Sequence, residues 1–400
     1  MTLKNILSIT ISIVFFSISP THAFSAYRVG VNYHQTGFDI DKSTFIRQYH
    51  LPGVRELVIT QLKDMVNAGT VVFNTRLWLT DPNPNSFPTV YQRLEFPLTT
   101  QSLDNIRQYT QDVSNLKTPS GKNVDLYFTF LWQGCAAYNG GYATWCNYSW
   151  DEYLYYAKYS IDQLFNTIGN INRPDGSKAV QKVYFDGEVI IEKVNTDKML
   201  TQVYPYFVSK ANASGITPTI YFMLKPDGTL DRFLSPTLDF MKANNLFIPP
   251  RIDISWYPVP GYPYEYLNTG YGALAENTFA NLHKQYPEHT FAIAETFYMK
   301  DPSVRREFGL AFATVAQKYG KLEELLIWPD FDYTNENNNS VWNAPRPYDM
   351  NSYYITPITK MGDLNGDGHV NLYDYTELIR GYSTLYTDDD FINVLSNYGK

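Results

Sequence analysis

The sequence has few cysteines, no basic stripe and, beyond its first residues, no long apolar run. Only two of its 400 residues are cysteine, so a disulfide-rich scaffold is excluded. Acids outnumber bases, 40 against 32, and no stripe rich in Lys and Arg alternates with aromatics, so nucleic acid is not an expected partner. Past the N-terminal region no segment has 18 unbroken apolar residues, so we expect no membrane contact after signal cleavage.

The N-terminal segment is typical of an exported protein. Lys4 precedes an apolar stretch over residues 6–18, and small residues follow near Ala23. This order predicts a secretory signal peptide over residues 1–23 and a protein that is secreted or periplasmic. An uncleaved amphipathic anchor is the alternative, although the apolar run is short for a membrane span.

The two cysteines, Cys135 and Cys146, lie close together in the sequence. An oxidising compartment allows a disulfide between them that closes one local loop. A metal site is less favoured because no His or second Cys pair stands nearby at ligand spacing. We therefore predict the Cys135–Cys146 disulfide, with two free thiols as the alternative.

Aromatic residues are abundant: 34 Tyr, 24 Phe and 7 Trp make up 16% of the chain. Such rings stack on sugars, but they fill protein cores more often. With 44% hydrophobic residues, the chain has enough apolar material for one large core. The composition is therefore compatible with a carbohydrate-binding protein without establishing one.

Short β-rich apolar segments alternate with longer segments of helical periodicity between residues 27 and 330. Strands are expected at 27–33, 70–79, 124–132, 182–188, 218–224, 251–258, 290–298 and 324–333. Eight strands alternating with helices predict an α/β fold, a (β/α)8 TIM barrel over residues 24–358. An open doubly wound sheet is the alternative, but no glycine-rich phosphate loop follows the first strand.

Two carboxylates interrupt the fourth expected strand, in the sequence VYFDGE. Strand alternation puts Tyr184, Asp186 and Glu188 on one face, and Val183 and Phe185 on the other. Functional side chains of such barrels lie at the C-terminal ends of the strands, so both carboxylates are expected at the mouth of the barrel. Alternatively, one or both lie in a solvated loop or cap the next helix.

A further carboxylate ends the seventh expected strand, in the sequence TFAIAETFY. Alternation predicts that Phe291, Ile293 and Glu295 share a face. An acid at the end of so apolar a strand is costly unless it is paired or functional. Glutamates after strands four and seven suit glycoside hydrolysis, in which one carboxyl protonates the leaving oxygen and the other attacks the anomeric carbon.

Five motifs carry a family resemblance. They are GVNYH at 30–34, TRLWL at 75–79, ISWYP at 254–258, IAETFY at 293–298 and IWP at 327–329. By their order and placement the chain resembles the retaining barrel glycosidases whose acid/base follows strand four and whose nucleophile follows strand seven. Among these it looks most like the arabinogalactan endo-β-1,4-galactanases. The resemblance covers the barrel thinly and implies an endo-acting hydrolase of O-glycosyl bonds in a polysaccharide or oligosaccharide.

The resemblance also implies roles for individual residues. Glu188 would be the general acid/base and Glu295 the nucleophile. Arg76 would keep Glu295 ionised through a charge-assisted hydrogen bond, and Tyr257 would donate to it. Independently of that resemblance, four tryptophans stand at or beyond expected strand ends, where they could line subsites by stacking on substrate: Trp78, Trp132, Trp256 and Trp328. Core or loop packing is the alternative for about half of these tryptophans, since the ring is largely buried on average.

Gly187 departs from the family pattern, which has Asn immediately before the acid/base. The departure leaves open that Asp186 and Glu188 contact substrate as a D-x-E pair of a substrate-assisted glycosidase, or act in an inverting one. A non-catalytic carbohydrate-binding or scaffold-attached barrel is the alternative from another class. Two glutamates together with Arg76 and Tyr257 favour catalysis, because a binding module has no need of them.

The segment GDLNGDGHVNLYDYTELIRGY, residues 362–382, has the spacing of an EF-hand calcium loop, with Asp in place of Glu at the twelfth position. The loop and the helix expected after it resemble a type I dockerin repeat, which implies a calcium-binding module over residues 359–400 and a cohesin-type scaffold partner. Dockerins normally carry two such repeats, and the second half of this segment lacks the ligand spacing. A calcium site with a purely structural role, without a cohesin partner, is therefore the alternative. Catalysis is expected to need no cofactor. The expected calcium ligands are Asp363, Asn365, Asp367, His369, Asn371 and Asp374.

Overall fold

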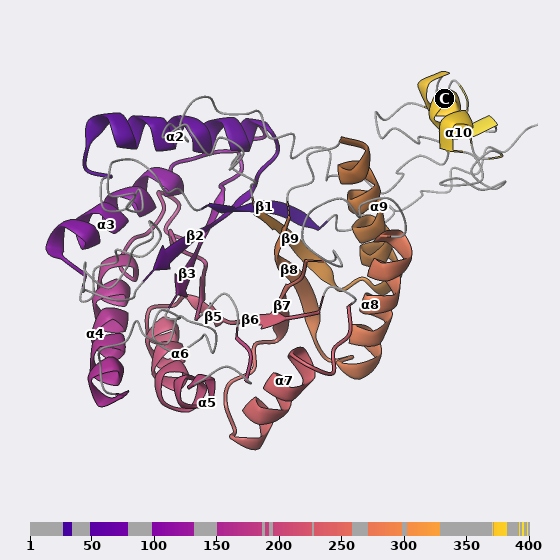
Figure 1. Cartoon of the computed structure of the whole chain (residues 1–400). Helices are drawn as coiled ribbons and strands as arrows, with labels where there is room; N and C mark the ends of the chain where they lie inside the picture. The colour runs from indigo at the N-terminus through magenta and orange to yellow at the C-terminus, as the bar shows by residue number, and fades with distance from the viewer. Residues whose placement is uncertain are drawn as a thin grey trace, which may run out of the picture.

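A computed structural model gives the fold of the chain (Figure 1). It describes residues 27–33, 49–78, 98–131, 150–185, 189–191, 195–225, 228–257, 271–297, 302–328, 370, 372–381, 392, 394–395 and 398. The predicted signal peptide and both cysteines lie outside these ranges and stay predictions.

The described strands form one parallel sheet. Their order in it is β5-β4-β3-β2-β1-β9-β8-β7-β6. The strands are β1 Arg28–Tyr33, β2 Val72–Trp78, β3 Asp125–Leu131, β4 Lys182–Tyr184, β5 Thr217–Thr219, β6 Tyr221–Met223, β7 Arg251–Ser255, β8 Thr290–Phe297 and β9 Leu322–Trp328.

The two edges of this sheet belong to one interrupted strand. The expected fifth strand is broken at Ile220 into β5, which pairs with β4, and β6, which pairs with β7. A parallel bridge between Val189 and Phe222 adds a further link near the break. The sheet therefore curls into a near-closed parallel barrel, and the predicted TIM-barrel-like α/β fold is confirmed.

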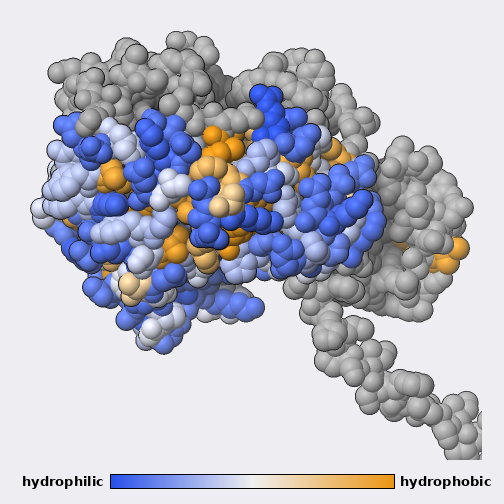
Figure 2. Space-filling model, turned by 90° about the horizontal axis from the view of Figure 1, so that it is seen from below, coloured by the Kyte–Doolittle hydropathy of each residue, from blue (hydrophilic) through white to orange (hydrophobic). Residues whose placement is uncertain are grey.

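Helices surround this barrel (Figure 1). Some have clear sequence signals: Thr99 caps the first turn of α3 by accepting from the Ser102 amide at 3.1 Å, and α2 begins at Pro52. Figure 2 shows a largely hydrophilic outer surface on the side that faces down in Figure 1. The helices are α2 Pro52–Asn67, α3 Thr100–Ser114, α4 Trp150–Ile168, α5 Thr196–Lys198, α6 Tyr204–Ala213, α7 Leu234–Ala243, α8 Tyr271–Gln285 and α9 Pro302–Tyr319, with a π-helical turn, Met199–Val203, before α6.

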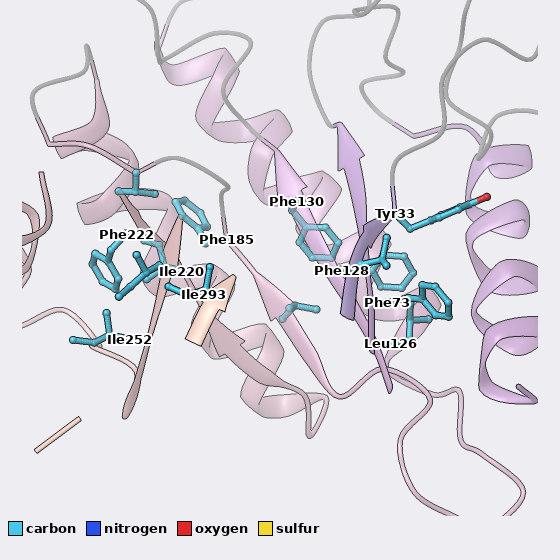
Figure 3. Close-up of a cluster of buried hydrophobic side chains, with 14 of the residues drawn as sticks. Tyr33, Phe73, Leu126, Phe128, Phe130, Phe185, Ile220, Phe222, Ile252 and Ile293 are labelled. Carbon is cyan, nitrogen blue, oxygen red and sulfur yellow. The ribbon is translucent and has the colours of Figure 1, made fainter. Parts of the chain in front are cut away.

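The apolar core has an outer and an inner part. The outer part fills the space between strands and helices, and it contains Val183 and Phe185, as alternation along β4 predicts. Figure 3 shows part of it, with Phe185 and Ile293 among the labelled side chains. The inner part lies inside the barrel and consists of Val72, Tyr127, Tyr184, Tyr221, Ala294 and Leu326, packed with the half-buried Val71.

The end of the barrel where the strands begin holds a network of ion pairs. Arg28 bonds Asp125 at 2.5 Å and also contacts Glu324, while Arg251 lies 2.7 Å from Glu324 and 2.6 Å from Asp253. Burial alone would raise the pKa of Glu324, but the charges of Arg251, Lys182 and Arg28 outweigh it and lower that pKa to about 2. This end of such barrels serves stability.

Near the C-terminus, α10 Leu372–Gly381 coincides with the helix expected after the calcium loop. Val370, Leu378 and Val394 form a small apolar cluster there. Five of the expected calcium ligands lie outside the described residues, and of Asp374 only the helical backbone is described. The calcium site and the boundary at residue 358 therefore stay predictions.

Candidate active site

Glu295 is the centre of a polar cluster at the end of the barrel where the strands finish. Arg76 on β2 reaches across the barrel, and its Nη2 lies 2.6 Å from Glu295 Oε2. Ser255, the last residue of β7, donates from Oγ to the same oxygen at 3.2 Å, and the Tyr257 hydroxyl donates to Oε1. The contacts expected from Arg76 and Tyr257 are thus present, and Ser255 adds one that the sequence analysis missed.

A β-bulge brings Glu295 to this position. On β9, Leu325 pairs with Ile293 and Ile327 with Thr296, so two residues of β8, Ala294 and Glu295, oppose a single residue. The register against β7 shows the same insertion, since Ile254 pairs with Ile293 and Ser255 pairs with Glu295.

The bulge corrects one expectation. Phe291 and Ile293 lie in the outer core, where Phe291 meets Phe279 of α8 edge to face and where Figure 3 shows the Ile293 side chain. Glu295 is instead directed towards Arg76 inside the barrel. The three residues therefore do not share a face. Simple alternation fails here because it assumes an uninterrupted ladder, and the extra residue shifts every later side chain to the opposite face.

The electrostatics of the cluster favour a charged pair. Glu295 is 3% exposed and Arg76 6% exposed, so both charges are held away from water. Burial alone would lower the pKa of Arg76, but the negative charge of Glu295 and its hydrogen bond, together with Tyr221 and Tyr257, outweigh burial and raise that pKa above its usual value. A permanent cation and two hydroxyl donors stabilise the ionised carboxylate and fix both of its oxygens.

Beneath this cluster the barrel interior carries buried amide and hydroxyl groups. Asn32 of β1 and Asn74 of β2 are fully buried, and Asn74 Nδ2 donates to Asn32 Oδ1 at 2.7 Å. Neither residue was expected at the site from the sequence. A polar residue inside the otherwise apolar β1 sequence is the signal that would have found Asn32.

The other predicted site residues fall into two groups. The ring of Trp256 is 1% exposed, its Nε1 donates to the Lys225 carbonyl at 3.1 Å, and it packs against Phe312 of α9. In this position it presents no face to a bound sugar. Glu188, Asp186 and Trp132 lie outside the described residues, and only the backbones of Trp78 and Trp328 are described, at the ends of β2 and β9.

The described residues contain no group of three or more His, Cys, Asp or Glu side chains arranged to hold a metal ion. Within the same ranges, no helix combines the length and apolar character needed to cross a membrane.

No family model matches the sequence, and no curated protein matches it. Among solved structures the chain is similar to a β-glucosidase from Thermotoga maritima in complex with cyclophellitol, with 10% identity, 76% of this chain and 88% of that chain covered, and a TM-score of 0.49. A family 5 xyloglucanase from Paenibacillus pabuli in complex with ligand matches with 13% identity, 82% and 99% coverage and a TM-score of 0.47.

A glycoside hydrolase family 5 enzyme from Prevotella bryantii matches with 11% identity, 74% and 86% coverage and a TM-score of 0.43. None of these three is named as a galactanase or a dockerin, so those finer resemblances stay predictions. The chain is therefore similar, at low sequence identity, to structures of glycoside hydrolases, and the functional inference rests on the side chains around Glu295.

Proposed function

We propose that the protein is a secreted glycoside hydrolase that cleaves polysaccharide with retention of configuration, using Glu295 as nucleophile. One observation carries the proposal: a nearly fully buried carboxylate, at the end of the barrel where such folds perform chemistry, is fixed by Arg76, Ser255 and Tyr257.

The reaction proceeds in two displacements. A Glu295 oxygen attacks the anomeric carbon while Glu188 gives its proton to the leaving oxygen, which forms a glycosyl ester on Glu295. Glu188 then takes a proton from water, and that water breaks the ester and regenerates the Glu295 carboxylate. This mechanism requires the two carboxyl groups to lie about 5 to 5.5 Å apart, whereas about 9 Å would imply inversion.

The first test is a panel of polysaccharides, including β-1,4-galactan as the substrate that the family resemblance suggests, with reducing ends measured over time. Wild-type protein should release reducing ends from at least one of them, and an endo-acting enzyme lowers viscosity early. A panel on which wild type and Glu295→Gln behave alike would reject the hydrolase in favour of a non-catalytic carbohydrate-binding barrel.

We extend the proposal to the C-terminal segment, in which residues 362–382 bind one calcium ion and residues 359–400 act as a dockerin-like module. The acidic loop side chains repel one another unless a divalent cation offsets their charge. Calorimetry on the full chain should show calcium binding that Asp363→Ala and Asp374→Ala remove. A chain truncated after Thr359 should keep its full rate on soluble substrate.

Two results would contradict this extension. Tight calcium binding by the truncated chain would place the ion elsewhere, and a rate that collapses on chelation would give calcium a part in catalysis. If the segment bound calcium but had no affinity for a cohesin module, the calcium ion would have a structural role only.

Export and the disulfide form a linked proposal. An exported chain meets an oxidising compartment in which Cys135 and Cys146 form a bridge. Intact mass under non-reducing conditions tests it, since a protein two hydrogens heavier than the bridged mass has free thiols.

A further inference from the structure

The bulge residue Ala294 is contacted by Asn32, which lies two strands away in the sheet. The Asn32 amide, on β1, donates from Nδ2 to the Ala294 carbonyl at 3.0 Å. These strands are not neighbours in the sheet, since β9 lies between them, so the bond crosses the barrel interior. Ala294 is the residue whose insertion turns Glu295 towards Arg76.

The orientation of the Asn32 amide is fixed by the groups behind it. Its Oδ1 accepts from Asn74 Nδ2 at 2.7 Å and from the Tyr221 hydroxyl at 3.3 Å. Thr129 in turn donates to Asn74 Oδ1 at 2.9 Å. With its oxygen held by two donors, the Asn32 amide must present its N–H groups on the other side, where the Ala294 carbonyl lies.

A bulge in a parallel ladder is rare and breaks the regular pairing of the backbone groups around it. Buried backbone carbonyls require hydrogen-bond partners, so a donor aimed at the bulge stabilises the bulged register against the regular one. In the regular register Glu295 would face the outer core beside Ile293, among apolar side chains.

We propose that Asn32 is a positioning residue: its amide holds the Ala294 bulge and thereby keeps the Glu295 carboxylate inside the barrel against Arg76. The catalytic consequence rests on the function proposed above, whereas the structural part does not depend on it.

The test compares Asn32→Leu, which keeps the branching at Cγ and removes the donor, with Asn32→Ala and a control. The control is Thr75→Val, which removes a buried hydrogen bond to Tyr109 on the outer face of β2. Hydrogen exchange of the full chain, followed for peptides within 290–297, should accelerate at least about tenfold in both Asn32 variants and stay near wild type in the control.

Kinetics supply the second readout. On a substrate found with the polysaccharide panel, the Asn32 variants should lose about 100-fold in kcat with KM within about twofold, because the nucleophile is misplaced while substrate contacts remain. The acidic limb of their pH profile should also move to higher pH, since Glu295 loses part of its pairing with Arg76.

The outcomes separate the two proposals. Unchanged exchange in residues 290–297 overturns the role of Asn32, whether or not the protein is active. Faster exchange with an unchanged kcat in an active enzyme overturns the positioning role. A wild type inactive on every glycan rejects the proposed function, while the exchange data still decide whether Asn32 holds the bulge. If both Asn32 variants fail to fold, Thr129→Val should accelerate exchange of the same segment by a smaller factor.

Discussion

The two ends of the barrel both bury charge, but they use it differently. Where the strands begin, Glu324 lies among the charges of Arg28, Lys182 and Arg251. Where the strands finish, Glu295 is held by one cation and two hydroxyl groups. Several cations around a carboxylate stabilise it as a permanent anion and oppose any change in its charge. One cation and neutral donors orient a carboxylate while leaving it able to form and break a bond.

Removing each carboxylate in turn should have the largest effects, and the two effects should differ in kind. Under the proposed mechanism, Glu295→Gly should lower kcat at least about 1000-fold, because no other group would attack the anomeric carbon, and azide should restore turnover with an inverted product. Glu324→Gln should keep kcat and lower the free energy of unfolding instead. Ordinary activity in Glu295→Gly would show that the nucleophile has been misassigned.

Removing one arginine from each end sharpens the difference. Arg76→Met should cost about 100-fold in kcat and move the acidic limb of the pH profile to higher pH, because the carboxylate beside it is no longer favoured as an anion. Arg173→Met is the matched control, since Arg173 is equally buried but lies 2.9 Å from Asp125 at the opposite end. Arg173→Met should lower the free energy of unfolding and leave the acidic limb of the pH–activity profile unchanged. An unshifted limb in Arg76→Met would contradict the electrostatic role.

Acid should weaken the end where the strands begin. The folded-state pKa of Glu324 is lowered from 4.5 to about 2, so its stabilising contribution is present above about pH 4.5 and is lost as the pH falls towards 2. The full contribution is of the order of 3 kcal/mol, at about 1.4 kcal/mol for each tenfold change. Urea unfolding at several pH values measures it, and Glu324→Gln should flatten the dependence. If the free energy of unfolding of Glu324→Gln depended on pH as strongly as that of wild type, Glu324 would not be the cause of the pH dependence.

The barrel was predictable from the sequence because each strand and helix shows its own local pattern. The apolar residues of β8 and the N-terminal cap of α3 are examples. It failed where the outcome depends on pairing between distant segments. The break at Ile220 and the insertion at Ala294 are properties of the ladder, so alternation within one strand cannot reveal them.

The cluster around Glu295 was predictable in part. Arg76 and Tyr257 came from motifs that resemble a known family, and both contact Glu295. Ser255 and Asn32 carried only weak signals, a polar residue within an apolar strand. The ion network of Arg28 and Glu324 carried none, because its members stand 296 positions apart and each looks like an ordinary strand-edge charge.

That separation bears on how the chain folds. Pairing of β1 with β9 closes nearly the whole barrel, and contacts so distant in sequence form late because the loop between them must first be ordered. Arg28 lies at this seam, and its guanidinium reaches Glu324 on one side and Asp125 on the other. We expect the contacts of Arg28 to form in the last folding step, after the transition state. Arg28→Met should therefore increase the unfolding rate far more than it decreases the folding rate. Stopped-flow measurements of both rates would test this.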